Sequence, residues 1–306
     1  MSYLWVVFTV VAAAGQTARN AMQRELTASL GAVGATHVRF LFGFPFALLF
    51  LTAVLIANHA GLPRTNATFW AWDVAGALCQ VGGTALMLMT MTERSFVVTT
   101  AYLKTEPVFV AVLGLVFLHD PITPGMAAAI VIATLGVVLI SLSTASRGAA
   151  SQPTALGRFD WRPALYGLSA GGLFAVSAIG YRGAILSLHL PGYVLGATFT
   201  LSVGLVIQAA VLSAFLAVRD LEVLRAIGKL WRPSLFAGFM GAAASEFWFL
   251  AFALASAASV RTLGLIDVLF AQGVSHLLFG QKTTPREAAG IVLLVAGAIL
   301  LVYAHR

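Results

Sequence analysis

Apolar residues occur along most of the chain in runs long enough to cross a lipid bilayer. A transmembrane helix needs about 20 largely apolar residues to span a hydrocarbon core of about 30 Å. Ten such runs alternate with polar connections, which are short except for residues 144–162. They predict helices over residues 3–25, 36–57, 70–91, 96–118, 123–143, 163–187, 192–217, 233–255, 257–279 and 286–304. The pattern therefore predicts an all-α integral membrane protein with ten transmembrane helices.

The second half of the chain repeats the first. Residues 70–145 recur as residues 231–306 without a gap, so that Trp70 corresponds to Trp231. Five predicted spans per half is an odd number, and the second copy must then be inverted in the membrane, as in many secondary transporters. We therefore expect two inverted five-helix repeats and a connecting loop, with the boundaries 1–145, 146–162 and 163–306.

Composition agrees with a membrane setting and excludes several function classes. Hydrophobic residues make up 60% of the 306 residues and charged residues 9%, whereas a soluble domain is about a quarter charged. The basic residues behind the net charge of +7 lie mainly in the connections, which favours membrane-flanking charges over nucleic-acid binding. The histidines show no metal-ligand spacing and no nucleophile stands beside a base, so we expect no metal, no cofactor and no catalytic residue.

The basic residues also predict an orientation. They gather in connections after odd-numbered spans, and the positive-inside tendency puts these connections in the cytoplasm and both termini outside. The basic residues in these cytoplasmic connections are Arg24, Arg94, Arg147, Arg158, Arg162, Arg219, Arg225, Lys229, Arg232, Lys282 and Arg286.

Acidic residues occupy one equivalent position in each copy of the repeat. Glu106 corresponds to Asp267, and both lie near the middle of a predicted span. A charged side chain at that depth costs at least about 2.5–3.5 kcal/mol, so it faces protein or water and is a candidate for function. Pseudo-symmetry would bring the two acids toward a shared central cavity. The alternative is a structural role, with each carboxylate bound to a basic partner.

The residues around Glu106 add detail to this prediction. Lys104 and Glu106 are two residues apart, which places them on different faces of a helix, so each needs a partner on another helix, a water-filled cavity or a substrate. Pro107 cannot donate a backbone hydrogen bond to Leu103, which predicts a kink and a free carbonyl oxygen.

Other polar residues within the spans complete the set of candidates. The first span carries a polar stripe that could line a cavity or pack against an acidic residue. The arginines at 19, 39 and 261 lie at shallower depth, from which their heads could reach an interface. The candidates for substrate binding are Gln16, Arg19, Asn20, Gln80, Lys104, Glu106, Glu246, Trp248 and Asp267. Those for coupling to protons are Glu106, Glu246 and Asp267.

The chain resembles the EamA-like members of the drug/metabolite transporter superfamily. The resemblance rests on Pro107-Val108-Phe109, on the acidic turn from Leu118 to Thr123, on Gly136 and on Arg39-Phe40-Leu41. It departs from the family where His119-Asp120 and Gly280-Gln281 replace Gly-Glu and where Val268 replaces the proline in the second copy. The resemblance implies ten helices and transport of small solutes. It also implies cytoplasmic termini, which opposes the orientation predicted from the charges.

Together these features predict a secondary transporter in the inner (plasma) membrane of a bacterium. Lys104 and Arg19 would attract a carboxylate, and Glu106, Asp267 or Glu246 would hold an amino group or a coupling proton. The solute would be a small zwitterionic, amino-acid-like metabolite, which we expect to be exported. One alternative is efflux of organic cations through a cation–π cage formed by the aromatic residues Phe247, Trp248 and Phe249 together with Glu246. A more remote alternative is an intramembrane enzyme or a lipid-binding scaffold.

Overall fold

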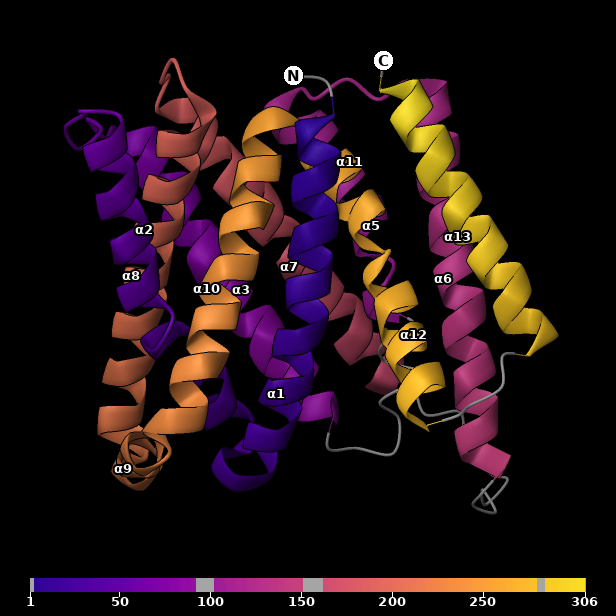
Figure 1. Cartoon of the computed structure of the whole chain (residues 1–306), viewed down its shortest axis with the longest axis horizontal. Coiled ribbons are helices and arrows are strands. Elements are labelled where there is room, and N and C mark those ends of the chain that lie inside the picture. The colour runs from indigo at the N-terminus through magenta and orange to yellow at the C-terminus, as the bar shows by residue number, and fades with distance from the viewer. Residues whose placement is uncertain (1–2, 92–101, 151–161, 280–283, 306) are drawn as a thin grey trace.

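A computed structural model describes residues 3–91, 102–150, 162–279 and 284–305, and every regular element in these ranges is a helix (Figure 1). The helices form a single bundle, with the two termini at the same end. The elements are α1 (Leu4–Leu41), α2 (Phe44–Ala57), α3 (Ala67–Met91), α5 (Glu106–Leu113), the π-helical turn η1 (Gly114–Leu118), α6 (Pro124–Ala150), α7 (Arg162–Ser187), α8 (Tyr193–Arg219), α9 (Leu221–Lys229), α10 (Trp231–Leu254), α11 (Ala257–Gly264), α12 (Asp267–Phe279) and α13 (Pro285–Ala304).

Seven helices in the described ranges are long and apolar enough to cross a membrane. They are Leu26–Ala57, Ala67–Met89, Pro124–Leu142, Ala164–Ser187, Tyr193–Arg219, Trp231–Leu254 and Pro285–Ala304. The other three predicted spans are also helical where the structure describes them. One is the first part of α1, one contains α5 and η1, and one is divided between α11 and α12.

The first two predicted spans are joined more closely than the sequence pattern indicates. Instead of ending near residue 25 in a connection, α1 continues to Leu41, and its only non-helical backbone angles are at Gly31, where φ is 68° and ψ is 175°. This positive φ is strained for residues that carry a Cβ, so glycine allows the chain to turn here without an exposed loop. The second span then continues from the end of α1 into α2.

The two equivalent acidic residues each begin a helix in the middle of a predicted span. Glu106 is the first residue of α5, with Pro107 in its first turn, and Asp267 is the first residue of α12. A carboxylate is favourable there because the helix dipole is positive at this end. Residues 104–105 form a turn directly before α5, which agrees with the disruption predicted from Pro107, and residues 92–101 of the same predicted span lie outside the described ranges. The break before Asp267 has no proline, so it was not predictable from the local sequence.

Helices from the two halves of the chain pack against each other in antiparallel pairs. α3 lies along α7, α1 along α10, and α6 along α13 (Figure 1). The direction of the last pair follows from its contacts, because Gly125 approaches Ala304 at one end and Gly290 approaches Ile140 nearer the other.

The contacts between α6 and α13 repeat with the two helices exchanged. A methyl carbon on Gly136 would lie 2.6 Å from the amide nitrogen of Leu294, and one on Gly297 would lie 2.7 Å from that of Ala133. In the sequence repeat, Gly136 corresponds to Gly297 and Ala133 to Leu294. A two-fold axis relates equivalent contacts in this way.

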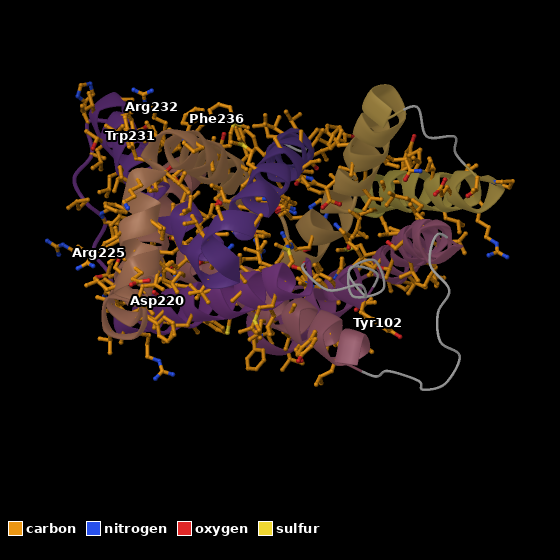
Figure 2. The ribbon with its side chains drawn as sticks, turned by 90° about the horizontal axis from the view of Figure 1, so that it is seen from below. Tyr102, Asp220, Arg225, Trp231, Arg232 and Phe236 are labelled. Carbon is orange, nitrogen blue, oxygen red and sulfur yellow. The ribbon has the colours of Figure 1, made fainter. Side chains whose placement is uncertain are left out.

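A short helix, α9, lies at the end of the bundle opposite the termini, where the sequence pattern predicts only a connection (Figure 1). Asp220 caps it by accepting a hydrogen bond from the amide of Val223. Ile227 is buried, whereas Arg225 and Lys229 are exposed. Figure 2 shows Asp220, Arg225, Trp231 and Arg232 along this end. Such an amphipathic helix suits the boundary between lipid and water.

Candidate functional site

Two ion pairs connect the halves of the chain at the breaks in their helices. The ammonium nitrogen of Lys104 donates to both carboxylate oxygens of Asp267, at 2.6 and 2.7 Å. The guanidinium of Arg261 binds Glu106 in a bidentate manner, with Nε 2.6 Å from Oε1 and Nη2 2.7 Å from Oε2. Each acid of the repeat is thus bound by a base from the other half.

Both acids are almost inaccessible, with exposed fractions of 8% for Glu106 and 7% for Asp267. In such surroundings an unpaired charge is costly, so these pairs contribute strongly to the arrangement of the helices. Lys104 and Glu106 take separate partners, in agreement with their spacing in the sequence. Of the three kinds of partner expected for Lys104 and Glu106, the structure shows a charged side chain from another helical segment in each case.

Trp248 stands beside the second ion pair. The guanidinium carbon of Arg261 lies 4.9 Å from the centre of the Trp248 ring, which is within the range of a cation–π interaction. Trp248 is 5% exposed. The face of this indole that Arg261 covers is therefore already occupied by a cation from the protein itself.

The polar stripe of the first span faces Asp267. The side-chain amide of Gln16 donates to Oδ2 of Asp267 at 3.4 Å, and the hydroxyl of Thr17 approaches its carbonyl oxygen at 3.4 Å. Arg19 donates to the side-chain oxygen of Asn20 at 3.0 Å. Thr17 was absent from the predicted site, although it lies between two predicted members of the stripe.

Arg19 and Arg39 converge at the same point of α10. Each is 4% exposed, and a methyl carbon on Gly241 would lie 3.5 Å from Cδ of Arg19 and 3.5 Å from Cγ of Arg39. Arg39 also donates to the hydroxyl of Thr84 at 3.3 Å. Both side chains are therefore buried inside the bundle, whereas their predicted shallow positions would have allowed them to extend to the membrane–water interface.

Two predicted site residues lie in separate hydrogen-bond networks. Oε1 of Gln80 accepts from the hydroxyl of Tyr181 at 2.9 Å and from the amide of Gln208 at 2.8 Å. Oε1 of Glu246 accepts from the hydroxyl of Thr198 at 2.5 Å. These networks place Gln80 and Glu246 apart from the two ion pairs, in contacts with α7 and α8.

Asp73 is a buried acid that the sequence reasoning did not identify. Its exposed fraction is 0%, and neither carboxylate oxygen has a hydrogen-bond partner among the described residues. A methyl carbon on Gly204 would lie 3.3 Å from Oδ1 of Asp73 and 3.5 Å from the hydroxyl of Tyr181. Asp73 and Gln80 are seven residues apart on α3, which places them on one helical face. This spacing could have identified Asp73 as a further candidate beside Gln80.

Comparisons with known proteins agree with this architecture. Residues 2–142 match the EamA-like transporter family. A solved structure titled only "Crystal structure of protein" superposes with a TM-score of 0.71 and 14% identity, over 98% of this chain and 97% of its own. At that identity the likeness concerns the fold alone. No curated protein matches the chain. The apolar helices and the family match together show a multi-pass integral membrane protein.

Proposed function

We propose that the whole protein is a secondary transporter built from two inverted five-helix repeats, because residues 2–142 match the EamA-like transporter family. It exposes a central site alternately to the two sides of the membrane. The exchanged contacts of α6 and α13 support the inversion, because equivalent helices run antiparallel. Ten spans follow if the first part of α1 and the two broken helices also cross the membrane.

The broken helices support the location of the site. In inverted-repeat transporters the solute binds near the midplane, where discontinuous helices present free backbone groups and dipole ends. Here both breaks lie at the ion pairs, with Glu106 and Asp267 as the first residues of α5 and α12. We place the solute between these helix ends and the polar stripe of α1. The two ion pairs hold the halves together in the arrangement described above.

The proposed mechanism is an exchange of ionic partners. A carboxylate on the solute competes for Lys104 and Arg19, and a solute amino group or a proton competes for Glu106 or Asp267. Gln16 and Asn20 offer amide groups for hydrogen bonds. When solute or proton replaces a cross-half contact, the halves can separate on one side and close on the other. This exchange accounts for a small, amino-acid-like metabolite.

The remaining candidates have secondary roles in this proposal. Trp248 positions Arg261 for Glu106, and Gln80 belongs to the network around Tyr181. Glu246 keeps one carboxylate oxygen, Oε2, without a partner among the described residues, which suits a second site for a coupling proton. We propose export across the inner membrane of a bacterium as the direction of net transport.

The observation that carries the proposal is the pair of cross-half ion pairs at helix breaks. Its test is counterflow of radiolabelled amino acids in proteoliposomes containing Glu106→Gln or Asp267→Asn. We expect the rate to fall by about tenfold or more, since about 1.4 kcal/mol of lost interaction corresponds to a factor of ten. Glu222→Gln, on the exposed side of α9, is the matched control and should keep the wild-type rate. Normal rates and an unchanged pH dependence in both test variants would contradict the assigned roles.

The other hypotheses receive less support. An organic-cation cage needs an open face on Trp248, whereas Arg261 already lies over that ring. Loss of quaternary-amine binding in Trp248→Ala would favour the cage. Turnover of a lipid by the purified protein would favour an enzyme, and the absence of flux for any solute would favour a scaffold.

A further inference from the structure

Around the two ion pairs, the described basic side chains outnumber the acidic ones, while the acids Asp73 and Glu246 lie in other contacts. Lys104 is matched by Asp267 and Arg261 by Glu106. Arg19 and Arg39 remain, and neither has a carboxylate partner among the described residues. Two positive charges within a bilayer are costly, so a compensating negative charge is expected at this place.

The two arginines also have donors with nothing to bind. Nε and Nη1 of Arg19 and Nε of Arg39 are buried, and none has a hydrogen-bond partner in the described ranges. Among the described residues, their side-chain hydrogen bonds go to Asn20 and Thr84, which are neutral groups, and the guanidinium carbon of Arg39 also lies 5.0 Å from the centre of the Phe40 ring. A buried guanidinium normally has its N–H groups satisfied, because an unpaired charged donor loses its hydration without replacement.

The repeat provides an internal comparison for Arg19. With a shift of two residues relative to the ungapped block, Ala18-Arg19-Asn20-Ala21 aligns with Tyr181-Arg182-Gly183-Ala184, which makes Arg182 the counterpart of Arg19. Arg182 binds both oxygens of Asp120 at 3.0 and 2.9 Å. Arg182 also donates to two backbone carbonyl oxygens of α10 and its C-terminal end. In the repeat, Asp120 corresponds to Gln281, which carries no charge. The sequence therefore supplies a carboxylate for Arg182 and none for Arg19.

We propose that Arg19 and Arg39 form a subsite for an oxyanion, the carboxylate or phosphate group of the transported solute. The preferred solute then carries a net negative charge. This inference rests on the proposed transport function and names its substrate class. Guanidinium groups suit it because their planar N–H donors match the geometry of carboxylate and phosphate oxygens. A zwitterion without a further acidic group leaves the surplus of positive charge uncompensated.

The first experiment measures binding to the purified full-length protein in detergent by isothermal titration calorimetry. The probes are succinate, inorganic phosphate, glycine and choline. We expect succinate or phosphate to bind, and the stronger of the two identifies the oxyanion. Glycine and choline should bind at least about tenfold more weakly, because neither supplies a net negative charge. If neither anion binds, or if glycine binds more tightly than both, the proposal is wrong.

Variants assign the binding to the two arginines. Arg19→Gln and Arg39→Gln should each weaken binding of the preferred anion by about tenfold or more. Arg19→Lys and Arg39→Lys keep the positive charge and lose the planar arrangement of N–H donors. Their affinity for the anion should therefore lie between those of the wild type and the glutamine variants. They also carry the test if the glutamine variants do not fold. Arg64→Gln, in an exposed connection, is the matched control. Wild-type affinity in all four test variants overturns the assignment.

Transport measurements separate this proposal from the one on which it rests. If the anions bind to the wild type but no solute shows counterflow, the subsite stands and the transport function fails. If glycine is transported at a rate that saturating succinate and phosphate do not change, and Arg19→Gln keeps that rate, transport stands and the subsite is wrong.

Discussion

Arg261 and Glu106 lie 155 residues apart in the sequence, and their side chains form a bidentate ion pair with atoms 2.6 and 2.7 Å apart. The pair ties the helix break of the first half to α11 of the second half. Because Glu106 is 8% exposed, water cannot replace either partner readily. This relationship predicts how single and double substitutions of the pair should differ.

Removing one partner of this pair should destabilise the protein more than removing both. Glu106→Ala or Arg261→Ala leaves an uncompensated buried charge, a change that costs about 3–5 kcal/mol in other proteins. The double substitution leaves no unpaired charge and should be closer to wild type. Thermal unfolding in detergent measures the difference. Additive losses in the double variant would show that the two side chains do not act as a pair.

The pair between Lys104 and Asp267 should tolerate an exchange of charge. Lys104→Asp and Asp267→Lys each put two like charges where the ion pair now lies, and each should lower thermal stability and the transport rate. The double variant restores opposite charges across the two halves and should recover part of the thermal stability and part of the transport rate. Counterflow and thermal unfolding of the three variants provide the comparison. A double variant no better than either single one would contradict a direct contact.

Equivalent glycines of α6 and α13 should respond to substitution in the same way. Alanine at Gly136 or Gly297 would place a methyl carbon within 2.7 Å of backbone atoms of the opposing helix. Overpacking of this kind costs about 1–3 kcal/mol, and a two-fold arrangement predicts similar losses at both positions. Gly172→Ala, where no heavy atom lies within 4 Å, is the control and should keep wild-type stability. Unequal losses at the two test positions would argue against the symmetry.

Two buried aspartates should respond in opposite ways to the same substitution. Asp73 has no hydrogen-bond partner among the described residues, so Asp73→Asn should preserve or raise thermal stability. Asp120→Asn should lower it, because Arg182 then loses the carboxylate that binds it at 2.9 and 3.0 Å. If Asp73→Asn is instead strongly destabilising, the carboxylate has a partner that the described contacts do not contain.

The orientation in the membrane is open to a direct measurement. The termini lie at one end of the bundle (Figure 1), and α9 with Arg225 lies at the other (Figure 2). The variant Arg225→Cys is made in a Cys79→Ala background and treated in intact cells with an impermeant thiol reagent. If the positive charges face the cytoplasm, the new cysteine should be protected from the reagent. Labelling of that cysteine would instead favour the cytoplasmic termini implied by the family.

Several parts of the site were predictable because they depend on local sequence. The duplication identified Glu106 and Asp267 as an equivalent pair, and the helical period showed that Lys104 could not neutralise Glu106. Pro107 indicated a break in the helix that contains it. The matching break before Asp267 was not predictable, because Val268 can continue a helix and the acid is held there by Lys104 from the other half.

The sequence by itself determined the apolar helices and the duplication, since both follow directly from the order of residues along the chain. Only the tertiary structure decided which charges meet. Arg261 and Arg39 looked alike in the sequence, as arginines at shallow depth, yet Arg261 binds Glu106 and Arg39 binds no carboxylate among the described residues. That difference depends on how helices distant in the chain pack, because a charge finds its partner within a few ångströms of space and at any separation in sequence.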